Sequence, residues 1–124
     1  MKGQYSHPLE ERFLELTVRL IRNIGTIPYS DVGLPIRKQL IRSGTSISIN
    51  YAEALASESR KDFIHKLQIT LKELRETHIN LRIIEKCNIS PAENELNYLI
   101  DECNQLIAIT VASINTLKKK ENQN

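Results

Sequence analysis

Apolar residues recur along the chain at intervals of three and four residues, which is the spacing of helices packed side by side. The interval is most regular in the segment around residues 34–56, where one line of positions is separated by 4, 3, 4, 3 and 4 residues. This line combines apolar residues with small polar ones: Ile36, Leu40, Ser43, Ile47, Asn50 and Ala54. Comparable lines run through three other segments. The pattern therefore predicts four helices, and no long segment alternates as a strand would.

Turn-forming and helix-capping residues separate these helices. Gly25 is expected to cap the first helix, and Pro35 suits the first position of the second because its missing N–H would be unpaired there. The segment 59–62 resembles a capping box, and the segment 90–93 combines an N-cap, a proline and an acid. The expected helices cover residues 9–24, residues 35–56, a third segment from residue 60, and residues 91–120.

Four helices joined by short connections predict an all-α protein, an antiparallel four-helix bundle with up-down-up-down topology. A chain of 124 residues has the usual size of one domain. Residues 9–120 are expected to form the bundle, between a flexible N-terminus at residues 1–8 and a flexible C-terminal tail at residues 121–124.

Further apolar residues lie beside the main stripes. In the first helix, Leu14, Val18 and Ile21 are expected to widen the inner stripe. The main members of that stripe are Phe13, Leu16, Leu20, Ile24 and Ile27. In the third helix a second, offset stripe consists of Ile69, Ile79 and Ile83. A helix that is apolar on two sides buries more than a lone bundle requires, and this favours self-association.

Small and polar residues interrupt the stripe of the second helix. Ser43 and Gly44 allow a neighbouring backbone to come close, whereas a buried Asn50 must find a hydrogen-bond partner or cost about 1–3 kcal/mol. Because a buried Asn fixes the register of coiled coils, Asn50 is interpreted in the same way here. Together with Glu53, these residues are predicted to serve structure and register.

No residue pattern indicates a catalytic site, a metal site or a cofactor. Glu53, Glu73 and Glu76 come nearest to a set of paired carboxylates, and an enzyme that uses them is an alternative. Lys72 and Arg75 alternate with the last two, however, which favours ion pairing. The three histidines are scattered, and the E-x-x-H pattern of di-iron bundles does not occur. We therefore expect that the protein is not an enzyme.

The two cysteines and the lack of targeting signals indicate a cytoplasmic protein. Cys87 is expected to end one helix, and Cys103 to lie about 18 Å along the next. A disulfide needs Cα atoms within about 7 Å, so two free thiols are expected, which fits a reducing compartment. The chain has no apolar run of about 18 residues and no secretory signal at its N-terminus.

Charge is distributed unevenly, although the net charge is only +2. Residues 90–105 contain four acids and no base, whereas residues 12–50 contain six bases and two acids. The six bases are the candidate nucleic-acid-binding residues: Arg12, Arg19, Arg22, Arg37, Lys38 and Arg42. The basic half could attract the acidic segment between copies of the chain, or it could bind the phosphate backbone of RNA or DNA.

One extended motif resembles a known family. Residues 42–47 are R-S-G-T-S-I, followed by Asn50, by A-E-A at 52–54, by K-D-F-I-H-K-L at 61–67 and by L-K-E at 71–73. This pattern resembles the small bacterial four-helix-bundle proteins that are also called 23S rRNA intervening-sequence proteins, because some are encoded within insertions in ribosomal RNA genes. A looser match covers residues 10–117.

The resemblance implies a bundle that assembles as a ring-like homopentamer, has a link to ribosomal RNA and is not an enzyme. A related group with the same fold comprises the accessory proteins of diversity-generating retroelements, which are basic pentamers that bind nucleic acid and a reverse transcriptase. That role is the alternative function, and the net charge of +2 is lower than it leads us to expect.

Overall fold

The computed structural model describes residues 8–89 and 93–123. These residues form the helices α1 (Pro8–Asn23), α2 (Gly33–Leu55), α3 (Arg60–Cys87) and α4 (Glu93–Gln123), with a 3₁₀ turn, η1 (Ile24–Thr26), after α1. Neither described range contains a strand. The all-α class and the four helices predicted from the sequence are therefore confirmed.

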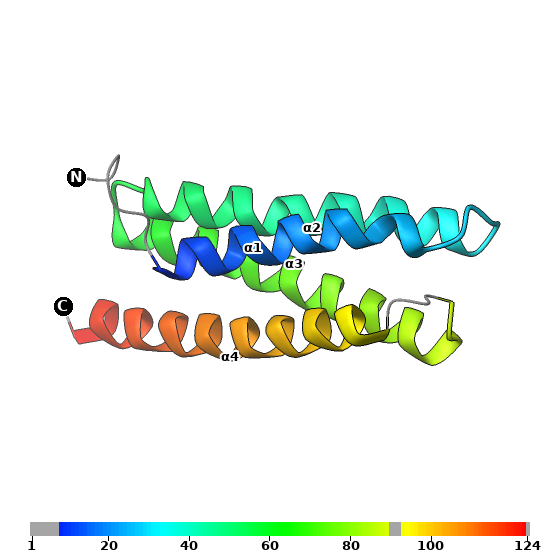
Figure 1. Ribbon diagram of the computed structural model, residues 1–124. Helices are drawn as coiled ribbons and strands as arrows, with labels where there is room; N and C mark the ends of the chain where they lie inside the picture. Colours follow the sequence, from blue (N-terminus) through cyan, green and yellow to red (C-terminus); the bar gives the residue numbers. More distant parts are fainter. Residues whose placement is uncertain (1–7, 90–92, 124) are drawn as a thin grey trace.

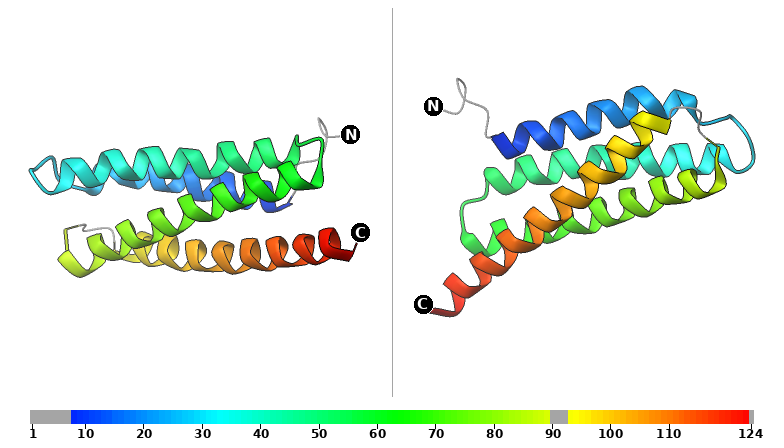
Figure 2. Two further views of the ribbon diagram at one scale, coloured as in Figure 1. Left: turned by 180° about the vertical axis from the view of Figure 1, so that it is seen from behind. Right: turned by 60° about the horizontal axis from the view of Figure 1, so that its bottom comes forward.

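The four helices lie side by side (Figure 1). α2 packs against α1 and α3, and α4 packs against α3 and α1, whereas α1 and α3 are not in contact. The start of α1 and the end of α4 lie at one end of the molecule, and the connection between α1 and α2 lies at the other (Figure 1). α4 crosses the other helices obliquely, so its second half diverges from α1 (Figure 2).

The core contains the main stripe predicted for the first helix, whereas the second stripe predicted for the third helix is largely exposed, with Ile79 at 51% and Ile83 at 42%. The five main residues of the inner stripe of the first helix are at most 8% exposed. Phe13 meets Tyr51 of α2, with their ring centroids 4.5 Å apart. Tyr51 is buried there, and desolvation raises its pKa to about 12. The side chains of Leu40, Leu74 and Leu106 from the other helices are fully buried, and each contributes about 1.5–3 kcal/mol.

The expected widening of the α1 stripe is not observed. Leu14, Val18 and Ile21 are 42%, 38% and 44% exposed. They lie outside the core because α1 contacts only two other helices, and no helix covers its outer side. The apolar stripe of α1 is thus divided into a buried line and an exposed line.

The end of α1 differs from the prediction. The sequence predicts Gly25 as the cap, but the left-handed conformation typical of a glycine cap is not formed, since no described glycine has a positive φ. Instead α1 tightens into η1, which closes with a hydrogen bond of 3.1 Å from the Ile27 N–H to the Ile24 carbonyl.

The start of α2 also differs, because Ser30 rather than Pro35 begins the helical turn. The Ser30 Oγ accepts a hydrogen bond from the Gly33 N–H, and its carbonyl accepts one from the Leu34 N–H, both at 2.9 Å. A β-carbon on Gly33 would lie 2.0 Å from the Pro28 carbonyl oxygen, so this turn requires glycine. Pro35 lies inside the first turn, where its missing N–H is still tolerated.

The predicted cap of α3 is confirmed, since the Ser59 Oγ accepts a hydrogen bond of 3.1 Å from the Asp62 N–H. α3 ends at Asn88, which adopts the left-handed conformation with φ of 54°. The predicted cap of the fourth helix at residues 90–92 lies outside the described residues, as do residues 1–7 and 124 of the predicted flexible ends. α4 continues to Gln123, beyond its expected end at residue 120.

Candidate functional site: the segment of α2 that joins three helices

Residues 42–50 of α2, called the contact segment below, pack closely against α1. A β-carbon on Gly44 would lie 2.3 Å from Cδ2 of Leu20, so the two helices meet where α2 has no side chain. The Thr17 Oγ1 donates a hydrogen bond of 2.8 Å to the Gly44 carbonyl, and the Ser48 Oγ donates one of 3.1 Å to the Phe13 carbonyl. The two hydroxyl oxygens also lie 2.6 Å apart, which is hydrogen-bond distance. Two hydroxyl hydrogens thus serve three contacts, namely the two carbonyls and the contact between the hydroxyls themselves.

The same segment meets α3 through a buried pair of hydroxyl groups. The Ser43 Oγ and the Thr77 Oγ1 are 2.7 Å apart, and both residues are 0% exposed. A buried hydroxyl without a partner would cost about 1–3 kcal/mol, so each hydroxyl satisfies the other. This pair holds α2 and α3 in one axial register.

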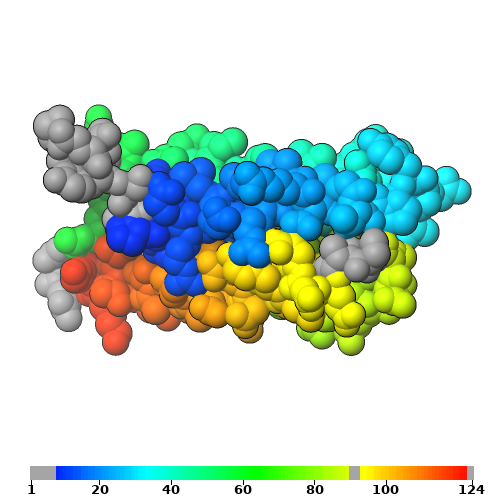
Figure 3. Space-filling model, in the orientation of Figure 1, coloured from blue at the N-terminus to red at the C-terminus, as the bar shows by residue number. Residues whose placement is uncertain are grey.

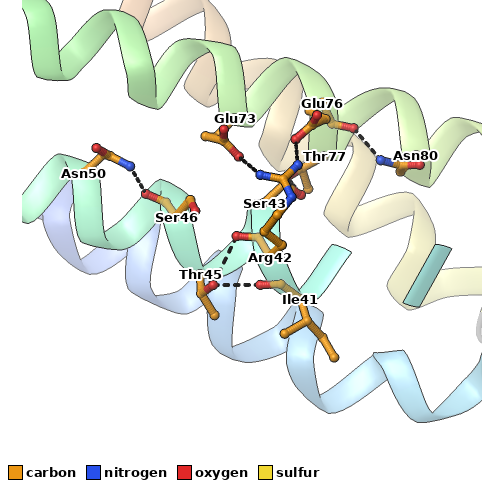
Figure 4. A network of polar contacts seen from close by, with 10 residues as sticks. All are labelled: Ile41, Arg42, Ser43, Thr45, Ser46, Asn50, Glu73, Glu76, Thr77 and Asn80. Atoms are coloured by element: carbon orange, nitrogen blue, oxygen red, sulfur yellow. Dashed lines mark hydrogen bonds and ion pairs between the residues drawn. The ribbon is translucent and has the colours of Figure 1, made fainter. Parts of the chain in front are cut away.

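Arg42 reaches α3 at the same level, as Figure 4 shows. Its Nη1 donates a hydrogen bond of 3.1 Å to Glu73, which is 8% exposed, and its Nη2 donates one to Glu76. The hydrogen bond with Glu76 is the largest of the effects that raise the Arg42 pKa. The predicted ion pairing of these glutamates is therefore observed, with Arg42 of α2 as the partner. Glu53 pairs in the same way with Lys66 of α3.

Asn50 is half-buried, and its Nδ2 donates a hydrogen bond of 2.9 Å to the Ser46 carbonyl in its own helix (Figure 4). Among the polar residues of the predicted α2 stripe, Ser43 is the one that crosses to another helix, where it meets Thr77. The register role assigned to Asn50 stays a prediction.

The contact segment lies within a longer match to a known family. The family described as 23S rRNA-intervening sequence protein matches residues 11–112, which include every contact described above. This chain belongs to that family. It is also similar to the crystal structure of a protein of unknown function from the S23 ribosomal protein family of Bacteroides thetaiotaomicron, with 30% identity and a TM-score of 0.76. The similarity covers 85% of this chain and 96% of that chain, and no curated protein matches this chain.

In this family member the first two candidate nucleic-acid-binding residues are engaged within the chain. Arg12 donates hydrogen bonds to both carboxylate oxygens of Glu102, at 3.1 and 2.6 Å. Arg19 donates to both oxygens of Glu95, at 2.6 and 2.8 Å, and its guanidinium lies 3.5 Å from the centroid of the Tyr98 ring. These bonds raise the pKa of both arginines and lower that of Glu95. The basic and acidic segments therefore attract each other inside one chain, between α1 and α4.

Two more of the six are also engaged, namely Arg42, as described, and Arg37. The Arg37 Nη1 donates to the carbonyls of Ile24 and Ile27, at 2.8 and 2.7 Å, and its guanidinium lies over the Tyr29 ring. The Ile24 carbonyl therefore accepts from both the Ile27 N–H and Arg37, and Arg37 ties the start of α2 to the turn after α1. Arg22 and Lys38 are exposed and form no ion pair with any described residue. Nucleic-acid binding by the six stays a prediction, and for Arg12, Arg19 and Arg42 a phosphate would compete with carboxylates.

Several residues of these contacts were not singled out from the sequence: Thr17, Ser48, Thr77, Glu95 and Glu102. The sequence contains one signal for Thr77. It follows Thr70 by seven residues, the same heptad interval that separates Asn50 from Ser43, so the two threonines form a polar line on one face of α3. For the glutamates, the acidic segment was recognised, but its partner depended on which helix lies beside α4.

Cysteine and metal chemistry add no second site in the described parts of the chain. Cys87 is exposed and Cys103 is buried, and neither forms a disulfide. Burial raises the pKa of the Cys103 thiol to about 12. No three His, Cys, Asp or Glu residues among those described lie together as metal ligands would, and none of the described helices is long and apolar enough to cross a membrane.

Proposed function

We propose that this chain is a cytoplasmic, non-enzymatic scaffold that assembles with copies of itself and contacts RNA or DNA. Each protomer would be an antiparallel up-down-up-down bundle. The family resemblance of the contact segment implies a ring of five copies. In such a ring, one surface of each chain meets a different surface of the next.

An exposed apolar line beside the contact segment carries this proposal. It comprises Leu14, Val18 and Ile21 of α1 together with Ile41 of α2, which is 45% exposed, and is called the self-association surface below. The three α1 residues are spaced by four and three positions, so they form one line along the helix. Figure 3 shows α1 on an open face of the molecule. Contiguous exposed apolar surface of this kind is typical of protein interfaces.

Ile41 lies close to this line because of the register between α1 and α2. The hydrogen bond from Thr17 to Gly44 sets that register. Ile21 is four residues after Thr17, and Ile41 is three residues before Gly44, so both lie on the same side of this contact. Ile41 is therefore level with Ile21 along the two helices.

The acidic side chains support a structural rather than a catalytic role. Glu73 and Glu76 are bound by Arg42, and Glu53 is bound by Lys66. A cavity between the helices, lined largely by apolar residues such as Leu20 and Leu99, measures about 20 Å³. That volume holds about one water molecule, so the cavity is too small for a substrate.

Light scattering at micromolar concentration tests the assembly. We expect a mass of about 71 kDa for five chains of 14.2 kDa, and a fall towards 14.2 kDa for the variant Val18→Glu/Ile21→Glu. The control Val32→Glu/Ile49→Glu changes one valine and one isoleucine at other exposed positions and should keep the wild-type mass. Circular dichroism should show equal helix content in all three proteins.

A wild-type mass near 14 kDa would refute self-assembly. A wild-type assembly that survives Val18→Glu/Ile21→Glu would instead place the interface on another surface.

A further inference from the structure

The outward side of α3 carries a row of unpaired cations. Lys61, Lys72, Arg75, Arg82 and Lys86 are exposed, and none forms an ion pair with a described residue. Their spacings of 11, 3, 7 and 4 residues keep them on one side of the helix. The row is about 37 Å long at a rise of 1.5 Å per residue. It is called the α3 basic row below.

Most acids of α3 lie away from this row. Glu73 and Glu76 face α2, where Arg42 binds both. Asp62 precedes Glu73 by eleven residues and so lies on the same line towards α2. Glu85 is exposed and follows Arg82 by three residues, so it lies beside the row. The row is therefore predominantly positive in charge.

The basic surface continues onto the end of α4. Lys61 and His65 of α3 line an open groove of about 270 Å³ together with Lys118 and Glu121 of α4, and Glu121 lies 3.8 Å from Arg60. Lys119 and Lys120 follow Lys118 and are exposed. This end of the molecule therefore adds further cations to the row.

We propose that the α3 basic row binds the phosphate backbone of a nucleic acid, which extends the proposed scaffold function. Unpaired lysines and arginines release counterions from a polyanion without first giving up a carboxylate, unlike Arg12, Arg19 and Arg42. A straight row of cations fits a ligand whose charges repeat along a line. Ile79 and Ile83 lie between the cations and are 51% and 42% exposed, where ribose carbons can contact them.

The row is also separate from the self-association surface. α3 does not contact α1, because α2 and α4 lie between them. An assembly built through α1 also uses a second surface of the neighbouring copy, and the mass of the α3 variant shows whether that surface is the row. The competing occupant is an acidic surface of another copy of the chain, and the experiment distinguishes the two.

Two variants with the same change in charge test the proposal. Lys72→Gln/Arg75→Gln removes one lysine and one arginine from the row, and Arg60→Gln/Lys66→Gln removes one of each that pair with Glu121 and Glu53. Affinity for a mixed-sequence single-stranded RNA is measured by fluorescence anisotropy between about 50 and 200 mM salt. Each lost phosphate contact reduces the slope of log K against log salt by about 0.7, so the α3 variant should lose about 1.4 and the control should match the wild type. Parallel measurements with an RNA duplex and a DNA duplex distinguish which kind of nucleic acid supplies the phosphate backbone.

Equal loss in both variants, or no binding of any of these nucleic acids at the lowest salt, would overturn the proposal. A reduced mass of the α3 variant in light scattering would also overturn it, because the row would then be a contact between copies. A monomeric wild type that shows the predicted difference in slope would support the row while refuting the ring.

Discussion

The buried hydroxyl pair of Ser43 and Thr77 allows a quantitative test of how α2 and α3 are held together. Ser43→Ala removes one hydroxyl and leaves the other without its partner in a fully buried site. Thr77→Val does the reverse with almost no change of shape. The double variant removes both hydroxyls and leaves no polar group unpaired.

The expected magnitudes follow from the burial of both residues. Leaving one buried hydroxyl unsatisfied costs about 1–3 kcal/mol, whereas replacing both partners with apolar groups is nearly neutral. Both residues lie inside helices, so the remaining hydroxyl can turn towards a carbonyl of its own helix and recover part of this loss. We therefore expect each single variant to lose about 1–2 kcal/mol of unfolding free energy, and the double variant to lose less than either single variant, with a loss near zero.

Urea unfolding followed by circular dichroism measures these differences from the midpoint and the slope of each transition. Because self-assembly makes stability depend on concentration, all four proteins must be compared at one concentration. Strict additivity of the two substitutions would refute the coupling. A Ser43→Ala variant as stable as the wild type would show that the pair does not hold the register.

Two further predictions concern charge and thiol chemistry. Because Arg19 lowers the pKa of Glu95, the stabilising effect of this pair is present above the ordinary glutamate pKa of 4.5 and is lost as the pH falls through the lowered value. Glu95→Gln should therefore reduce the difference in urea midpoint between pH 7 and pH 3. The control Glu15→Gln, at an exposed position without an ion pair to a described residue, should leave that difference unchanged. The same difference in both variants would contradict the pairing. A maleimide reagent at about pH 8 should modify the exposed Cys87 and spare the buried Cys103, because burial raises the pKa of the Cys103 thiol to about 12. Mass spectrometry of the labelled protein identifies the modified cysteine. Labelling of Cys103 in the folded protein would show that the core opens there.

Much of the fold could be predicted because it follows from rules that act over a few residues. The three- and four-residue spacing predicted four helices, and the Ser59 cap was recognised from its own side chain and that of Asp62. The start of α2 was missed because a carbonyl of Pro28 and a hydroxyl of Ser30 decide it, and both precede the helical pattern.

The candidate site was predicted only in part. Ser43 and Gly44 were recognised as positions where helices approach, since a small residue in an apolar stripe indicates close packing. Their partners Thr77 and Leu20 could not be paired with them from the sequence. Spacing along α2 does not contain the relative heights of α1 and α3, so it could not show which side chains meet.

The amino-acid sequence by itself determined the helical class, the main buried line of α1 and the motif that places the chain in its family, because these depend on neighbours within a turn or two. Only the tertiary structure decided that Arg12 meets Glu102, ninety residues away, and that Leu14 faces solvent rather than the core. It likewise decided which cations are neutralised and which remain on the outward side of α3. These outcomes depend on the distances and rotations between helices, which the periodicity of a single helix does not contain.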